Sequence, residues 1–151
     1  MPDVYATIAE ADVAMQERLA EVLELRAADP AQRSMLEEYT AQLDLADGSE
    51  MLEVGCGTGA VSRYLATLPG VAHVTGLDPS PLFVERARAL AGDAPVDFAV
   101  GDGRALELDG ERFDAVVLHT SLCHVPGCEQ ALASAQLCSG SVGSSASVIV
   151  A

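Results

Sequence analysis

Basic and aromatic side chains are the scarcest groups in this sequence. Its 151 residues include eight basic and 23 acidic side chains, which gives a formal net charge of −15 at pH 7. Nucleic acids and anionic membrane surfaces bind through basic patches, which so acidic a chain does not offer. We therefore expect neither nucleic acid nor a membrane among its partners. Tryptophan is absent and aromatic residues make up 4%, so the core is predicted to consist of Ala, Leu and Val.

Long apolar runs and paired cysteines are missing as well. No run approaches the ~18 residues of a membrane span, and residues 1–5 lack the basic and apolar segments of a signal peptide. The sequence therefore predicts a cytoplasmic protein. The four cysteines are Cys56, Cys123, Cys128 and Cys138, with no C-x-x-C pair among them, so we expect reduced thiols. Because Cys123, His124 and Cys128 match no standard zinc spacing, no metal is predicted.

The most informative stretch is residues 51–59, Met-Leu-Glu-Val-Gly-Cys-Gly-Thr-Gly. A short apolar run contains the acid Glu53 and ends at three alternating glycines, Gly55, Gly57 and Gly59, after which an amphipathic segment begins. This pattern predicts a strand, a tight turn and a helix, with backbone amides at the carboxyl end of a parallel strand. Glycines allow a ligand to approach the main chain closely, because a Cβ would block it.

Acidic residues also end or follow the next two predicted strands, 73–78 and 96–100, and a fourth strand is predicted at 113–118. The second strand ends on Asp78, and an acid about 20 residues past a glycine loop is where a ribose diol is held. Ser80 and Pro81 then predict the start of a helix. The third strand stops before Asp102. We therefore expect Glu53, Asp78 and Asp102 to gather at one edge of the sheet.

These residues resemble the class I S-adenosylmethionine-dependent methyltransferases, in the small-molecule branch that includes ubiquinone and menaquinone biosynthesis enzymes. The resemblance rests on residues 52–59, 76–80, 101–102 and 113–117. It implies that the glycine loop lies against the methionine part of the cofactor, that Asp78 takes the ribose hydroxyls and that Asp102 takes the adenine amino group. The cofactor-binding residues that it implies are Glu53, Gly55, Gly57, Asp78, Pro79, Asp102, Gly103 and His119.

An α/β three-layer, Rossmann-like fold is predicted, with a mainly parallel sheet in the order 3-2-1-4-5. Residues 1–46 are expected to form a helical cap on the cofactor-binding methyltransferase domain 47–151. In the cap, Ile8, Met15, Leu19, Val22 and Leu23 predict one inward stripe over residues 4–28, and Asp29 and Pro30 begin a second helix. Residues 129–137 predict a helix and 148–150 a fifth strand. The resemblance implies one more helix and two more strands, which are lacking, so an exposed strand edge and a homodimer are expected.

Two other functions fit parts of the pattern. Gly55, Gly57 and Ala60 match the G-x-G-x-x-A form of nicotinamide-binding domains, although Glu53 would then lie beside a pyrophosphate. A cofactor-binding module without turnover is the second alternative, because part of the family's usual substrate wall is lacking. We predict methyl transfer from S-adenosylmethionine to a small molecule, and assign no catalytic residue.

Two side chains outside the resemblance remain open to two interpretations each. His124 fits either a general base or a turn residue bonded to backbone, and the second is favoured. Arg33 either reaches the cofactor carboxylate or lies solvated on its helix, and the second is again favoured.

Overall fold

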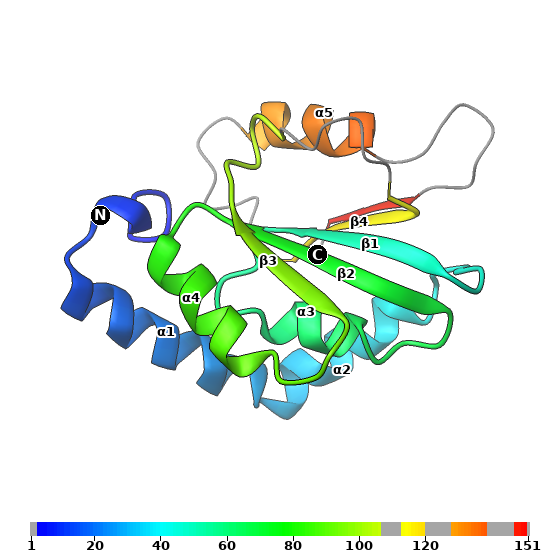
Figure 1. Ribbon diagram of the computed structural model, residues 1–151, viewed down its shortest axis with the longest axis horizontal. Coiled ribbons are helices and arrows are strands. Elements are labelled where there is room, and N and C mark those ends of the chain that lie inside the picture. The colour runs from blue at the N-terminus through cyan, green and yellow to red at the C-terminus, as the bar shows by residue number, and fades with distance from the viewer. Residues whose placement is uncertain (1–2, 107–112, 120–127, 139–146, 151) are drawn as a thin grey trace.

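The fold is one sheet between two layers of helices (Figure 1). The structure is a computed structural model that describes residues 3–106, 113–119, 128–138 and 147–150. Five strands pair in the order β3-β2-β1-β4-β5, and every pairing is parallel. The strands are β1 (Ser49–Val54), β2 (Val71–Asp78), β3 (Val96–Val100), β4 (Ala115–Leu118) and β5 (Ser147–Val150). The predicted fold class and strand order are confirmed.

Helices α1 to α4 lie on one side of the sheet, and α5 lies on the other (Figure 1). They are α1 (Val13–Ala27), α2 (Pro30–Thr40), α3 (Ala60–Leu65), α4 (Pro81–Leu90) and α5 (Cys128–Cys138), preceded by a 3-10 turn, η1 (Ile8–Glu10). Side-chain caps begin two of them as predicted: Asp29 accepts from Ala31 N at 2.7 Å and Ser80 from Phe83 N at 3.2 Å. These caps satisfy amides that the first helical turn leaves unpaired.

The two faces of the sheet bury different sets of side chains. Successive residues of a strand point to opposite faces, so Met51 and Leu52 enter separate cores. Met51 packs with Val74, Phe98 and other residues beneath α3 and α4. Leu52 packs with apolar residues of β2 and β4 and with Ala131 of α5. Because both faces are covered, β4 is apolar along its length.

The first helical segment differs from its prediction. Residues 4–28 form no continuous helix, because Asp12 caps a new helix by accepting from Met15 N at 2.9 Å. Met15 and Val22 are 40% and 42% exposed, so the predicted inward stripe is wrong at these two positions. Gln16 and Ala20 are buried in their place. The predicted strand 113–118 is also shorter, since β4 begins at Ala115.

Candidate functional site

The glycine loop joins β1 to α3 in a conformation that glycine favours. Gly55, Gly57 and Gly59 have φ values of 75°, 53° and 81°. These values lie in the left-handed region, where the backbone of a residue with a side chain is strained. The amides of Gly55 and Cys56 both donate to Leu77 O, at 2.7 and 2.9 Å. The loop is therefore fastened to the carboxyl end of β2, which sets the spacing between the loop and Asp78.

Asp78 bridges the two loops at this edge of the sheet. Its carboxylate accepts from Gly57 N and from Ser80 N, each at 2.9 Å. The residue is 6% exposed, and burial raises the pKa of its carboxyl to about 6, although the two amides oppose the shift. Each carboxylate oxygen can accept more than one hydrogen bond, so Asp78 keeps capacity for a ligand hydroxyl.

Glu53 is a second buried acid, at the end of β1. It is 2% exposed, and Ser62 Oγ at the first turns of α3 donates to its Oε2. Burial raises the pKa of the Glu53 carboxyl to about 8, and the charge of Asp78 adds to the rise. At neutral pH this carboxyl is therefore largely protonated unless a cation lies nearby. The predicted proximity of Glu53 and Asp78 is what the structure shows.

The third predicted acid, Asp102, has a different environment. It follows β3 at the same edge of the sheet but is exposed and paired with Arg104, whose Nη2 lies 2.6 Å from Asp102 Oδ2. The hydrogen bonds from Arg104 hold the pKa of Asp102 below its usual value. A Cβ on the neighbouring Gly103 would lie 2.5 Å from Val54 Cγ1, so this turn passes close over β1. Pro79, also predicted, is exposed.

His119 follows β4 and is 8% exposed. Its Nδ1 lies 3.1 Å from Tyr39 Oη in a hydrogen bond, so a residue of α2 fixes the ring of His119. Burial lowers the pKa of His119, and the positive charge of Arg26 lowers it further. The ring is thus neutral at pH 7. Cys123 and His124, the residues considered above for a zinc site, lie outside the described residues. The general-base role considered for His124 is therefore not tested.

A pocket of about 80 Å³ lies between the glycine loop and α1. Of the predicted residues, Glu53, Gly55, Gly57 and His119 line it. Asp78, Pro79, Asp102 and Gly103 are not among its described lining residues. The structure therefore brings half of the predicted residues to one pocket. Asp78 does not line this pocket but accepts a hydrogen bond from Gly57, which does.

Three side chains near the pocket were not predicted. Arg26 lines it from α1, and Tyr39 and Ser62 hold His119 and Glu53. Tyr39 lies 80 positions from His119, so no spacing in the sequence indicates that contact. Ser62 lies only nine positions after Glu53, but a serine early in a helix carries no signal of its own. In the described part of the chain no carboxylate pairs with Arg26.

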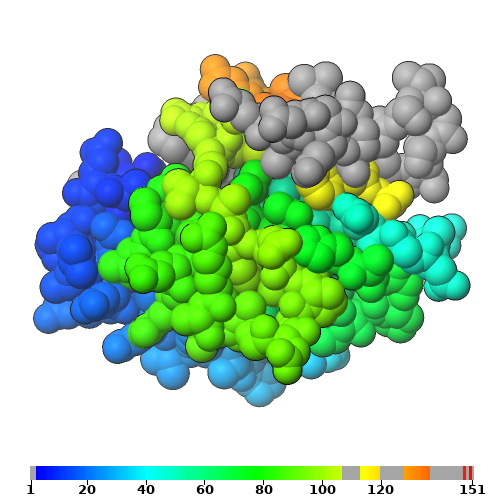
Figure 2. All heavy atoms as spheres, in the orientation of Figure 1, coloured from blue at the N-terminus to red at the C-terminus, as the bar shows by residue number. Residues whose placement is uncertain are grey.

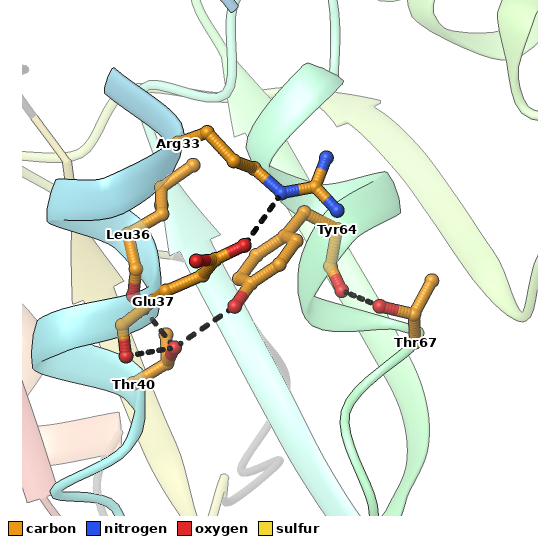
Figure 3. A network of polar contacts seen from close by, with 6 residues as sticks. All are labelled: Arg33, Leu36, Glu37, Thr40, Tyr64 and Thr67. Carbon is orange, nitrogen blue, oxygen red and sulfur yellow. Dashed lines mark hydrogen bonds and ion pairs between the residues drawn. The ribbon is translucent and has the colours of Figure 1, made fainter. Parts of the chain in front are cut away.

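Arg33 is not among the described residues that line the pocket, and Figure 3 shows it beside Glu37 and Tyr64. Its Nε donates to Glu37 Oε1 at 3.2 Å, and its guanidinium lies 5.0 Å from the centre of the Tyr64 ring. Tyr64 Oη also pairs with Thr40 Oγ1 at 3.2 Å. These contacts join α2 to α3, and the side chain of Arg33 remains 60% exposed, in line with the favoured surface role.

A parallel sheet of this order, with a glycine loop after β1 and acids at the carboxyl ends of β1 and β2, is the arrangement of the Rossmann-like class I methyltransferases. A protein-family model described as "Methyltransferase domain" matches residues 51–138. This is more than half of the sequence, and the chain belongs to that family, as its resemblance indicated. S-adenosylmethionine is the cofactor of this family.

Individual relatives agree with this assignment. The chain is 41% identical over 80 residues to a ubiquinone biosynthesis O-methyltransferase of Methylobacterium sp. (strain 4-46), covering 52% of this chain and 31% of the relative. A chain of the Haloferax volcanii Trm112 methyltransferase activator complex has a TM-score of 0.66 at 26% identity, over 81% of this chain and 51% of that one. A TehB-like methyltransferase of Corynebacterium glutamicum shares the fold, with a TM-score of 0.68 at 23% identity over 92% and 73%.

The matched part of this chain spans between 18% and 38% of the length of the curated relatives. Among the helices in the described ranges, each is too short or too polar to cross a membrane. Within the same ranges, no three His, Cys, Asp or Glu side chains come together as a metal site requires.

Proposed function

We propose that this chain binds S-adenosylmethionine and transfers its methyl group to a small-molecule acceptor. The observation that carries the proposal is the pair of buried acids, Glu53 and Asp78, on either side of a glycine loop in a methyltransferase domain. The curated relative named above is an O-methyltransferase of ubiquinone biosynthesis, which supports a small acceptor. The atom that is methylated stays open.

The residues present fit this cofactor. Its ammonium and sulfonium groups favour acids, and Glu53 lines the pocket with no cationic partner bonded to it among the described side chains. Asp78 would hold the ribose hydroxyls with its remaining lone pairs, beside Pro79. Gly55 and Gly57 would allow close approach to the main chain. When bound, the cofactor supplies an electrophilic methyl group on a sulfonium.

Arg26 and Asp102 would hold the two ends of the same molecule. Arg26 offers a guanidinium to the pocket, and a carboxylate is the group that it binds best. We therefore assign it, rather than Arg33, to the carboxylate of the methionine part. Asp102, with Gly103, is assigned to the adenine amino group, because carboxylate oxygens bonded to Arg104 still have acceptor capacity.

His119 and Tyr39 would order the part of the pocket next to β4. Burial and the nearby Glu53 raise the pKa of Tyr39, so its hydroxyl keeps its proton and can donate to His119 Nδ1. The proton of the neutral ring is then on Nε2, where it can orient an acceptor oxygen. Methyl transfer depends mostly on alignment of two reactants, which rigid side chains of this kind provide.

Localisation and assembly complete the proposal. We place the protein in the cytoplasm, supported by the free thiols of Cys56 and Cys128. We also propose a homodimer through β5, which pairs only with β4 among the described strands and so offers a sheet edge. The helical cap 1–46 and the domain 47–151 are proposed as one structural unit.

The activity is tested by incubating the protein with methyl-labelled S-adenosylmethionine and a panel of phenols, catechols and carboxylic acids. Formation of S-adenosylhomocysteine that depends on an acceptor supports methyl transfer. Calorimetric binding of S-adenosylhomocysteine without turnover on any acceptor would favour a binding module. Binding of NAD with none of the adenosyl ligand would contradict the proposal.

A further inference from the structure

The strand β3 is one edge of the sheet, and it pairs only with β2 among the described strands. Gly101 N, just after β3, donates to Asp78 O of β2 at 3.1 Å. Because the backbone groups of alternate residues point to the same side of a strand, successive residues of β3 face β2 and the open edge in turn. The three that present their amides and carbonyls to the open edge are Val96, Phe98 and Val100.

A side chain of α4, Arg88, occupies the middle of this edge. Its Nε and Nη2 both donate to Phe98 O, at 3.0 and 2.7 Å. At the start of the strand, Val96 N donates to Ala94 O at 2.8 Å. Two of the three outward residues therefore already have a backbone group in a hydrogen bond. Figure 2 shows the atoms of α4 and β3 side by side on one face of the molecule.

Arg88 is held in this position by the packing of its helix. The neighbouring Ala87 is fully buried and packs with Phe98 in the core beneath α3 and α4. Arg88 itself lies in the last turn of α4, where the helix dipole favours a positive charge. A hydrogen bond from a charged guanidinium is stronger than the neutral amide–carbonyl bond of a sheet. A strand that adds to β3 would therefore exchange a stronger bond at Phe98 O for a weaker one.

We propose that Arg88 blocks the β3 edge and prevents a second copy of this chain from pairing with it. Without the guanidinium the edge is self-complementary. In an antiparallel arrangement with a two-fold axis at Phe98, this residue exchanges two hydrogen bonds with Phe98 of the second copy, and Val96 lies opposite Val100. Unprotected edge strands associate in this way, and charged side chains are a common protection. The inference concerns assembly and does not rest on the proposed methyl transfer.

Sedimentation velocity tests this role of Arg88 without any ligand. The variants are Arg88→Met, which removes the donors of the side chain, and Arg86→Met as the matched control, which removes the same charge from an exposed position of α4. At micromolar concentration we expect the weight-average mass of Arg88→Met to rise about two-fold above that of the control, since a two-fold contact joins two copies. The control should sediment as the wild type does. When Val100→Lys is added to Arg88→Met, a charge returns to the edge, and the mass should fall back to the value of the control.

Hydrogen exchange measured by mass spectrometry at low and high protein concentration shows which strand is used. In Arg88→Met, peptides that cover residues 96–100 should exchange more slowly at the higher concentration, because the Phe98 amide gains a partner. Their exchange in the wild type and in Arg86→Met should not depend on concentration. Equal mass in Arg88→Met and Arg86→Met, or a higher mass without slower exchange at residues 96–100, overturns the proposal. Concentration-dependent exchange at these residues in the wild type overturns it as well, even if Arg88→Met does not fold.

Discussion

At the residue scale, the charge of Glu53 depends on what lies in the pocket. Burial and the charge of Asp78 raise the pKa of its carboxyl from 4.5 to about 8, so the neutral acid is favoured when no cation lies beside it. A cation beside Glu53 favours the ionised form instead. Binding of a cationic ligand near pH 7 should therefore release a proton, and protonation of Glu53 should oppose binding at lower pH.

Protein stability should report the same titration. Because the folded state holds the Glu53 proton more tightly than the unfolded state does, the free energy of unfolding should fall as pH rises from about 4.5 to about 8. His119 acts in the opposite direction, but only below its usual 6.5. In Glu53→Gln, an uncharged side chain that still accepts from Ser62, the fall between pH 7 and 8.5 should disappear. Urea unfolding at several pH values measures this.

Glu50→Gln is the control for that experiment, since Glu50 lies exposed on the same strand. It should keep the pH dependence of the wild type. A wild-type stability that is flat from pH 7 to 8.5, or a slope that survives in Glu53→Gln, would show that Glu53 is not the group whose titration sets the stability in this range.

At the element scale, the glycine loop and the helix after it depend on close packing as well as on φ. Gly59 has a φ of 81°, and a Cβ there would lie 2.5 Å from Phe98 Cζ. Gly48 has a similar φ of 86°, but a Cβ there would meet nothing within 4 Å. The two positions separate backbone strain from steric conflict.

Gly48→Ala should destabilise the protein by about 1–2 kcal/mol, the cost of a side chain in the left-handed region. Gly59→Ala should cost about 1–3 kcal/mol more, because Phe98 must also move in a packed core. Urea unfolding of both variants measures the difference. Equal losses would mean that Phe98 moves away freely and that the contact does not fix the loop.

The elements themselves were largely predictable from the sequence, because each signal is local. Alternating and continuous apolar runs indicated the strands, and Ser80 and Asp29 indicated helix starts. Glu53 and Asp78 were predictable because the carboxyl ends of parallel strands meet at one edge. The rotation of α1 was not, since apolar Met15 and Val22 are exposed while Gln16 is buried by its bond to Ser80.

Contacts between side chains of helices that are far apart in the sequence could not be predicted either, because no local pattern indicates them. Glu24, Arg26 and Tyr39 lie on α1 and α2. The sequence does not indicate which polar residues of these helices face the sheet, because that depends on how each helix packs. The sequence predicted which residues end the strands, and it left open which cap residues meet them.

At the scale of the whole molecule, the two edges of the sheet allow a controlled test of the proposed homodimer. Val150 on β5 is 50% exposed and Val100 on the opposite edge strand, β3, is 52% exposed. If β5 pairs with a second copy, Val150→Lys should shift the protein toward monomer, because charge on an edge strand opposes pairing. Val100→Lys should leave the assembly unchanged. Light scattering at micromolar concentration measures both.

A wild-type protein that is monomeric under those conditions would contradict the use of this edge. A dimer that both variants retain would place the interface elsewhere on the molecule.

Calorimetric titration with S-adenosylhomocysteine, of the wild type and of Asp78→Ala, tests the central claim most directly. We predict that the wild type binds and that Asp78→Ala binds more weakly by about 1.5–3 kcal/mol, the range for hydrogen bonds to a charged group. Asp93→Ala, which removes an exposed acid remote from the loop, should bind as the wild type does. Equal affinity in all three proteins, or binding of NAD in place of the adenosyl ligand, would contradict the assignment of this pocket.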